Sequence, residues 1–395
     1  MPRAICLVHH VGIQAYPYLI DTAKSLAQAG WQVDVLAWAD APLPEYQFQD
    51  PRIHTHRFHH VARGDSSIHH LVRFVAYVVW AVAVACRRHY SSFIGFDQNG
   101  LIAASLASLI SGNAPVLYYS PELHVSKDLT ALKDRVKKQM ERLFSRHAKA
   151  IIVQNRRRAD ILIRDNGLGA KQVYLVPNAP LAGDDFTCPP DFLPNLLARH
   201  GIHGSRIVVL HIGTISDLTR VREIAQTVDE WPSKCILVVH GWGQPEYIEE
   251  LIRFASRYDP PRIIISRSVL PYDELQGLVR LADIGLALYL GDIVNRYEMA
   301  SGKLYQYMKA GLPVITSDFP ALREVVETNE AGVCIDGEEM EGLSAAVTRL
   351  ARDSALRQRF GQNAHRAFLE KYAYEKEFAP VLSFLDSLGS EAVAR

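Results

Sequence analysis

The stretch from Glu298 to Ile315, EMASGKLYQYMKAGLPVI, decides the fold of the second half of the chain. It opens with a carboxylate and a few small residues, and a helix follows whose apolar positions have the i, i+3, i+4 spacing of a buried stripe. Those positions are Leu304, Tyr307 and Met308. Gly311 suits the end of that helix, and the apolar run Leu312–Thr316 predicts a buried strand. Loop, helix and strand in this order form half a repeat of an α/β domain.

The start of this helix has the properties of an anion-binding site. Its first four N–H groups lack partners within the helix, and the helix dipole is positive at this end. Phosphate groups or polar hydroxyls are therefore favoured there. Glu298 precedes the helix and Gln306 lies eight residues further on, so both side chains are placed to face one ligand.

The same stretch resembles the signature of the retaining glycosyltransferases of family 4, which have the two-domain GT-B fold. The family pattern is Glu, seven residues and Glu, followed by a Met-containing helix turn and a G-x-P-V-I strand. Glu298 falls on the first Glu, Gln306 falls on the second, and the GLPVI run that ends at Ile315 matches without gaps. The resemblance is clear over about residues 170 to 375 and faint in the first domain.

The resemblance implies a role for each residue of this stretch. Glu298 is implied to be catalytic and to lie near the donor sugar, whereas Ser301, Gly302 and Lys303 lie at the donor phosphates. The second family Glu holds the ribose hydroxyls of the nucleotide, and Gln306 stands in its place here. A neutral amide can hydrogen-bond a ribose, but more weakly than a carboxylate does.

A second segment, HIGTISDLTR (His211–Arg220), resembles the loop of the donor domain where an Arg and a Lys contact the diphosphate. Thr214 occupies the Arg position, and Arg220 lies one residue from the Lys position. Lys303 is the expected replacement for the missing cation, because two positive charges matter where no metal neutralises the leaving diphosphate. The alternative for Arg220 is a solvent-exposed residue at the start of a helix, without a role in binding. Val269 falls where family members contact the base.

The first domain is expected to bind the acceptor. Gly12, just beyond the first strand, matches the Gly-containing loop under the donor phosphates, where the family usually has two adjacent Gly residues. The segment YYSPELHVS (Tyr118–Ser126) resembles the one written YDAHEL in relatives, with Pro121 at the His position. His124 either takes over part of that role as a catalytic residue or is a surface residue.

Length and composition agree with a two-domain enzyme. A chain of 395 residues exceeds one compact core, and equal numbers of basic and acidic residues, 43 of each, give no case for nucleic acid. The five Cys residues are scattered without a CxxC pair, which argues against disulfides or zinc and fits a reducing cytoplasm. The first residues, MPRAICLVHH, are expected to enter a strand directly, without a signal peptide. The histidines between His54 and His70 are expected to be solvated surface.

Strand and helix signals alternate along the whole chain, which predicts parallel sheets covered on both faces. We expect an α/β fold of the GT-B type, with two Rossmann-like domains whose sheets face a central cleft. The domains are residues 1–185, which bind the acceptor, and 186–365, which bind the nucleotide sugar. Residues 366–395 form a helical segment that returns to the first domain. The predicted strands are Ala4–His10, Val33–Trp38, Ile53–Phe58, Ser92–Phe96, Val116–Ser120, Ala150–Gln154, Val173–Pro177, Ile207–Ile212, Ile236–His240, Arg262–Ser266, Ile284–Leu290, Val314–Ser317 and Gly332–Ile335.

Two segments of the first domain bear on membrane contact. Phe74–Cys86 is apolar throughout but is shorter than the roughly 20 residues that cross a bilayer as a helix. A buried or partly exposed helix of the first domain is the favoured interpretation, and an in-plane membrane contact is the alternative. The basic stretch Lys133–Arg158 also contains an apolar stripe, which predicts an amphipathic helix with a solvated basic face. Attraction to an anionic membrane that bears a lipid-linked acceptor is the alternative for this stretch.

The resemblance therefore implies a metal-independent hexosyltransferase-like enzyme, which moves a sugar from a nucleotide-diphosphate sugar to an acceptor hydroxyl with retention, in glycan or glycolipid synthesis. We expect no cofactor and no metal. The acceptor is a glycan, a lipid-linked compound or a small molecule. The expected location is the cytoplasm, with peripheral contact at the inner membrane face as an option. Two alternatives remain: a non-catalytic GT-B relative that binds a nucleotide or protein partner, and a sugar-nucleotide epimerase.

Overall fold

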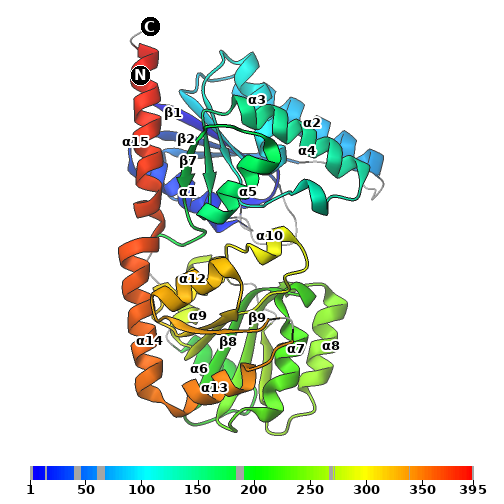
Figure 1. Cartoon of the computed structure of the whole chain (residues 1–395), viewed down its shortest axis with the longest axis vertical. Coiled ribbons are helices and arrows are strands. Elements are labelled where there is room, and N and C mark those ends of the chain that lie inside the picture. The colour runs from blue at the N-terminus through cyan, green and yellow to red at the C-terminus, as the bar shows by residue number, and fades with distance from the viewer. Residues whose placement is uncertain are drawn as a thin grey trace. The chain divides into compact units, whose positions relative to one another are not determined.

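The computed structural model describes residues 3–13, 16–39, 46–59, 67–183, 191–266, 270, 272–337 and 339–393. Its contacts divide the chain into two compact units (Figure 1). Unit 1 comprises Met1–Asn178 and Tyr374–Arg395, and unit 2 comprises Ala179–Ala373. The domain boundaries predicted from the sequence are residues 185 and 365.

Unit 1 is built on a seven-stranded parallel sheet with the order β3-β2-β1-β4-β5-β6-β7. The strand order reverses between β1 and β4, so the carboxyl ends of these two strands form the topological switch point of the sheet. The strands are β1 (Ala4–Val8), β2 (Gln32–Trp38), β3 (Ile53–Phe58), β4 (Ser92–Phe96), β5 (Val116–Tyr119), β6 (Ala150–Val153) and β7 (Gln172–Leu175).

The helices of unit 1 cover both faces of its sheet. All four helices between β3 and β7 belong to crossovers that run in one direction along the sheet, and right-handed crossovers place them on one face. On the other face, α1 packs against the C-terminal helix α15. The elements are α1 (Pro17–Gln28), α2 (Ser67–Ala85), α3 (Asp97–Ile110), η2 (Ser126–Asp128), α4 (Leu132–His147), α5 (Arg156–Asn166) and α15 (Tyr374–Val393).

Unit 2 is built on a six-stranded parallel sheet with the order β10-β9-β8-β11-β12-β13. Its switch point lies between β8 and β11. The strands are β8 (Ile207–Ile215), β9 (Cys235–Gly243), β10 (Ile263–Ser266), β11 (Ile284–Ala287), β12 (Val314–Ser317) and β13 (Gly332–Ile335). The helical elements are α6 (Phe192–Arg199), η3 (Asp217–Thr219), α7 (Val221–Gln226), η4 (Thr227–Glu230), α8 (Pro245–Ala255), α9 (Tyr272–Arg280), α10 (Val294–Tyr297), α11 (Gly302–Lys309), α12 (Pro320–Thr328), α13 (Leu343–Arg352), α14 (Ser354–Ala367) and the π-helical turn η5 (Phe368–Tyr372).

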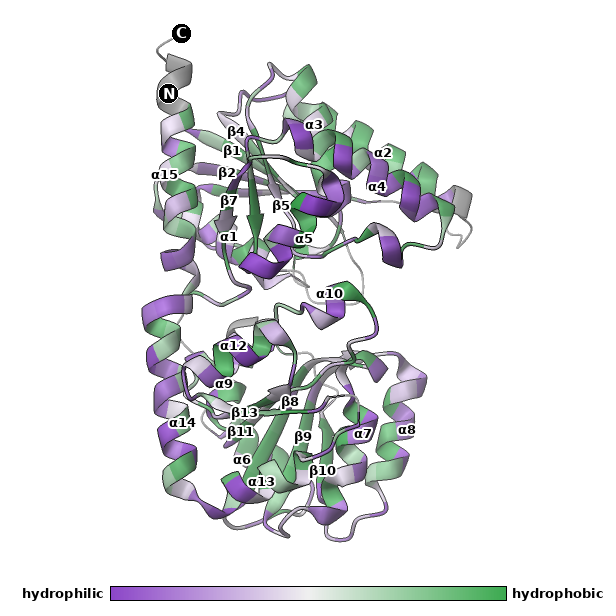
Figure 2. Cartoon of the chain, in the orientation of Figure 1, coloured by the Kyte–Doolittle hydropathy of each residue, from purple (hydrophilic) through white to green (hydrophobic). Residues whose placement is uncertain are grey.

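Each face of the unit 2 sheet has its own apolar core, because side chains alternate between the two faces of a strand. On β8, Val208, Leu210 and Ile212 belong to one core, and Ile207 and Val209 belong to the other. The strands are accordingly hydrophobic along their length, as Figure 2 shows for β8 and β9. Burial on both faces is the reason that the sequence shows apolar runs here.

All thirteen predicted strands are confirmed, with shifts of a few residues at their ends. The apolar stripe of α4, which the amphipathic pattern predicts to be covered, is buried at Phe144, but the prediction is wrong for Leu132, Val136 and Leu143, which are exposed. Lys138 and Glu141, on the side opposite to these three residues, are buried. In the part of the chain that the structure describes, no helix combines the length and apolar character needed to cross a bilayer.

Candidate functional site

The start of α11 holds most of the residues singled out in unit 2. The chain leaves the short helix α10, passes Glu298, which is 5% exposed, and reaches Ser301 as the N-cap of α11. The Ser301 hydroxyl accepts from the Leu304 N–H (3.2 Å) and lies 2.5 Å from the hydroxyl of Tyr289. Because Ser301 is fixed from two sides, the first N–H groups of α11 have a fixed direction.

The rest of α11 is anchored so that its start cannot shift. Gly311 has a φ of +74°, and the N–H groups of Gly311 and Leu312 donate to the carbonyls of Met308 and Tyr307, which is a Schellman end. The Tyr307 ring lies against β11 at Gly285, where an added Cβ would come within 2.4 Å of the ring. The Tyr307 hydroxyl accepts from the Ile212 N–H (3.1 Å), which joins α11 to β8. The predicted Gly311 stop and buried stripe are confirmed.

Lys303, in the first turn of α11, is half-buried and lies beside the last residues of β8. Its Nζ lies 3.4 Å from Nε2 of His211 and 5.0 Å from the centre of the Tyr289 ring, and its Cε is the nearest atom to a Cβ placed on Gly213. Among the described residues, no carboxylate forms an ion pair with Lys303. Burial lowers the pKa of Lys303 to about 7, since no counter-charge opposes it. An anion at this position would supply the missing charge.

His211 lies beside Lys303 but supplies no negative charge to pair with it. Nε2 of the buried His211 ring lies 3.1 Å from the Thr214 carbonyl and donates its proton there. Burial and, secondly, the charge of Lys303 lower the pKa of His211 well below its usual value. Nδ1 of His211 is buried and has no hydrogen-bond partner in the described part of the chain.

Gln306 presents an unsatisfied acceptor one turn further along α11. The residue is buried, and its Oε1 atom has no hydrogen-bond partner among the residues that the structure describes. A buried amide oxygen left without a donor costs free energy, which a ligand hydroxyl would recover. This fits the position that the resemblance assigns to the ribose.

Arg220 lies on the loop after β8 and is partly neutralised. It has a left-handed backbone conformation at φ 56°, between η3 and α7, and its Nη1 lies 3.3 Å from Oε1 of Glu223. Arg220 and Lys303 therefore differ in kind, because one cation has a carboxylate partner and the other has none among the described residues. Val269 lies outside the described residues.

The two remaining sequence-predicted residues belong to unit 1 and not to this set. Gly12 is buried in the loop after β1, where the neighbouring Val11 carbonyl accepts from the Trp38 N–H (3.3 Å). His124 is half-buried in the segment after β5. The structure thus brings together Glu298, Ser301, Gly302, Lys303 and Gln306 around one helix start, and the roles assigned to all nine residues stay predictions.

Sequence reasoning missed a polar set at the switch point of unit 1. His9 and His10 follow β1, and Asp97 and Asn99 follow β4. Asp97 has a φ of 57°, and its Oδ2 lies 3.7 Å from Nε2 of His9. Within the described residues, three buried atoms of this set lack hydrogen-bond partners: Nε2 of His10, Oδ1 of Asp97 and Oδ1 of Asn99. Polar residues directly after the carboxyl ends of two neighbouring strands were the available signal.

In the ranges given above, no group of three or more His, Cys, Asp or Glu side chains is placed to hold a metal ion. In the histidine-rich stretch, His56 pairs with Asp34 instead, with Nε2 and Oδ1 2.8 Å apart. The Asp34 carboxylate also pairs with Arg88 at 2.9 Å.

Two units, each with a parallel sheet covered by helices, define the GT-B class of fold. Comparison with known proteins identifies the family. The family described as glycosyl transferase 4-like domain matches residues 15–179, and the family described as glycosyl transferases group 1 matches residues 206–353. The chain belongs to glycosyltransferase family 4. It is an enzyme, a nucleotide-sugar-dependent glycosyltransferase.

Two curated relatives are also transferases or synthases. The chain is 24% identical over 280 residues to the alpha-D-kanosaminyltransferase of Streptomyces kanamyceticus. The matched region covers 68% of this chain and 69% of that protein. It is 22% identical over 188 residues to the N-acetyl-alpha-D-glucosaminyl L-malate synthase of Bacillus anthracis, with coverage of 47% and 46%.

Solved structures support the fold over nearly the whole chain. The sucrose-phosphate synthase of Thermosynechococcus elongatus has a TM-score of 0.74 at 17% identity and covers 98% of this chain and 100% of its own. HepE of Anabaena in complex with UDP-glucose has a TM-score of 0.74 at 16% identity, with coverage of 97% and 99%. The predicted GT-B fold is confirmed.

Proposed function

We propose that the start of α11 binds the diphosphate of the donor, with Lys303 as the main cation. The observation that carries this proposal is a half-buried ammonium without an ion-pair partner among the described residues, beside the free N–H groups of a helix start. Burying a charge without a partner is costly, so a protein retains it where a ligand supplies the opposite charge. Arg220 and the N–H groups of Gly302 and Lys303 complete the binding site.

Gln306 binds the ribose of the nucleotide. Its buried Oε1 accepts a hydrogen bond, and each ribose hydroxyl can donate one. The amide makes this contact without adding negative charge near the diphosphate. The structure of HepE was solved with UDP and with UDP-glucose, so we propose a uridine nucleotide as the first donor to test.

Glu298 orients the hydroxyls of the donor sugar. The carboxylate is nearly buried and lies four residues before Gly302, so it is close in the chain to the phosphate-binding amides. Carboxylate hydrogen bonds to hydroxyls are strong and directional, which suits the positioning of a sugar during transfer. We expect the product to retain the anomeric configuration of the donor.

The charge that develops on the leaving diphosphate is stabilised by the protein. Lys303, Arg220 and the amides of α11 are fixed before the donor arrives, and fixed donors need no reorganisation during the reaction. The proposal therefore includes no metal and no cofactor.

Unit 1 binds the acceptor at the switch point of its sheet. The buried polar atoms of His10, Asp97 and Asn99 that lack partners among the described residues can hydrogen-bond an acceptor hydroxyl. His124 remains a candidate for the same role. The acceptor is a glycan, a lipid-linked compound or a small molecule in glycan or glycolipid synthesis. The proposed location is the cytoplasm, with peripheral membrane contact.

Calorimetry with UDP, GDP and ADP tests the donor site directly. The wild type should bind at least one of them, and Lys303→Gln should lower that affinity by at least about tenfold, the scale of one lost charge-assisted contact. Lys234→Gln, at an exposed lysine of the same unit, is the matched control and should bind as the wild type does. Equal affinity of Lys303→Gln and wild type, or no binding of any nucleotide, would refute the proposal.

A further inference from the structure

Helix α4 is built with its apolar side toward solvent. Leu132 is 76% exposed, and Val136 and Leu143, which lie on the same side at helical spacing, are exposed as well. On the opposite side, Lys138 and Glu141 are 2% and 0% exposed. An ordinary surface helix does the reverse, because burying charge and exposing leucine both cost free energy.

A buried polar network fixes this orientation of α4. Glu141 pairs with Lys138 at 3.2 Å and accepts hydrogen bonds from Gln98 of α3 (2.6 Å), Tyr118 of β5 (3.0 Å) and Asn166 of α5 (3.1 Å). Turning the helix to cover its leucines would break every one of these contacts. These contacts therefore keep the apolar stripe of α4 exposed to solvent.

Helix α2 has a second stripe of the same kind. Leu71, Val75 and Val79 follow one another at a spacing of four residues and are all exposed, whereas Tyr77 and Ala81 on the inner side are buried. The helix contains one Arg and no acidic residue. Figure 2 shows hydrophobic residues along α2.

The two stripes belong to one layer. Helix α3 packs against both α2 and α4, and all three lie on the same face of the sheet. The end of α3 adds Leu109 and Ile110, both exposed. We call these exposed aliphatic residues of α2, α3 and α4 the apolar patch.

The charge on this layer is positive. Helix α4 has six Lys or Arg residues and two acidic ones, and one of the two, Glu141, is buried in the network. Lys133, Arg135 and Arg146 are exposed beside the apolar stripe. Aliphatic side chains flanked by Lys and Arg match the interface of an anionic bilayer, which takes the aliphatic groups and attracts the cations.

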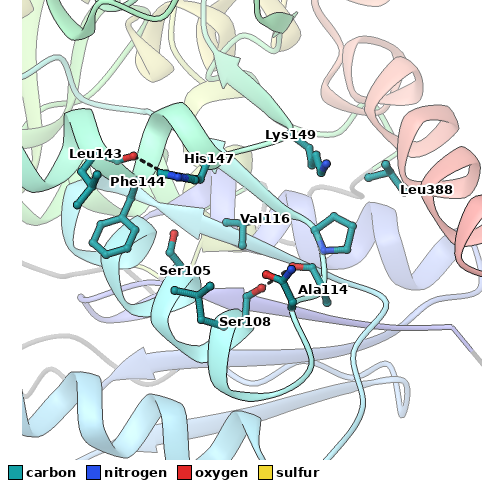
Figure 3. Close-up of a pocket in the computed structure, with 12 residues that line it drawn as sticks. Ser105, Ser108, Ala114, Val116, Leu143, Phe144, His147, Lys149 and Leu388 are labelled. Carbon is teal, nitrogen blue, oxygen red and sulfur yellow. Dashed lines mark hydrogen bonds between the residues drawn. The ribbon is translucent and has the colours of Figure 1, made fainter.

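A groove adjoins the patch at the ends of α3 and α4. It has a volume of about 740 Å³, and Leu109 and Leu143 of the patch are part of its wall. Figure 3 shows Val116 and Phe144 in the groove, with His147 and Lys149 also lining it. The groove thus has apolar walls and a cationic side chain, the same combination of groups as the patch.

We propose that the apolar patch docks the enzyme on an anionic lipid bilayer. The inference names the surface for the membrane contact included in the proposed function, and it rests on that part of the proposal. A second copy of the chain is disfavoured as the occupant, because a symmetric interface would place the basic residues of α4 against themselves.

Vesicle flotation of the full chain tests the docking. The wild type should float with vesicles of phosphatidylcholine and phosphatidylglycerol in equal parts, and less with pure phosphatidylcholine. Leu132→Gln combined with Val136→Gln should reduce the bound fraction at least about tenfold, because two exposed aliphatic groups are lost. Lys133→Glu combined with Arg135→Glu should abolish the preference for the anionic vesicles.

Matched controls separate docking from folding and from donor binding. Leu175→Gln combined with Leu369→Gln removes two exposed leucines outside the patch and should leave flotation unchanged. All variants should keep the thermal stability and the nucleotide affinity of the wild type, so a failure here is distinct from a failure of the donor site. No flotation of the wild type, equal flotation of the Leu132 and Val136 variant, or loss of self-association in that variant would overturn the proposal.

Discussion

The surroundings of Lys303 set the pKa of its side chain. A lysine on the surface is charged at any ordinary pH, whereas burial without a counter-charge lowers the pKa of Lys303 to about 7. The neighbouring His211 cannot help, because its ring is neutral and donates to the Thr214 carbonyl. The charge state of Lys303 therefore depends on whether an anion is bound.

This coupling predicts a pH dependence of donor affinity. Below about pH 7 the free enzyme already carries the Lys303 charge, and above it binding must first take up a proton. Affinity for a nucleotide sugar should therefore fall as pH rises above 7, by up to about tenfold per pH unit. Calorimetry with the wild type measures the slope. Lys303→Arg, which stays charged, should flatten it, and an unchanged slope in that variant would assign the dependence to another group.

Gln306→Glu tests the departure from the family pattern. If Gln306 only replaces the family Glu at the ribose, the carboxylate should bind the two hydroxyls at least as well, and donor affinity should rise or change by no more than a few-fold. The measurement is nucleotide-sugar affinity by calorimetry. A drop of more than about tenfold, or ~1.4 kcal/mol, would mean that the amide N–H₂ has a specific partner.

At the scale of residues, only part of the candidate site could be predicted from the sequence. Glu298, Ser301 and Lys303 could be assigned because they sit in one contiguous motif. His211, Tyr289 and Asp97 could not, since their places depend on which strand ends become neighbours in the sheet. The resemblance also ranked Arg220 with Lys303, and only the structure shows that Arg220 pairs with Glu223.

At the scale of elements, hydrophobic patterning located the strands well and oriented α4 wrongly. Parallel strands covered on both faces show as apolar runs, so their positions follow from the sequence alone. An amphipathic pattern shows that a helix has two different sides, but not which side meets the sheet. The orientation of α4 is set by Glu141, which accepts hydrogen bonds from residues of three other elements, Gln98, Tyr118 and Asn166.

This reversal predicts an unusual pattern of stability. Glu141→Ala should lower the free energy of unfolding by about 3 kcal/mol or more, because it leaves three buried donors without their acceptor and removes one of the two carboxylates that pair with the buried Lys138. Leu143→Ala, at an exposed leucine of the same helix, should change it by no more than about 0.5 kcal/mol. Urea unfolding of both variants compares the two costs. A larger loss for Leu143→Ala would contradict the orientation of α4.

At the scale of the whole molecule, the proposed roles of the two units as donor and acceptor domains rest on the polar residues at the ends of their strands. Each unit presents polar residues at the carboxyl ends of its strands, near its own switch point, as open α/β sheets do. Unit 2 offers cations and amides, and unit 1 offers neutral and acidic hydrogen-bonding groups. The first set suits a diphosphate and the second suits a hydroxyl, as the proposed donor and acceptor sites require.

The assignment of the diphosphate to protein groups predicts activity without added metal. Transfer should persist in excess EDTA, because Lys303, Arg220 and the amides of α11 are proposed to stabilise the leaving group. The assay compares rates before and after chelation. Complete loss of activity that Mn²⁺ or Mg²⁺ restores would overturn this assignment.

The central claim is that the α11 site of unit 2 holds a nucleotide sugar for transfer. The most direct measurement is turnover of a panel of UDP, GDP and ADP sugars by the wild type and by Glu298→Ala, with nucleotide affinity measured in parallel. The wild type should consume at least one donor, and Glu298→Ala should lose at least about 30-fold in rate, or ~2 kcal/mol, while it still binds the nucleotide. Near-normal turnover by Glu298→Ala, or no turnover of any donor by a wild type that binds nucleotide, would contradict the claim.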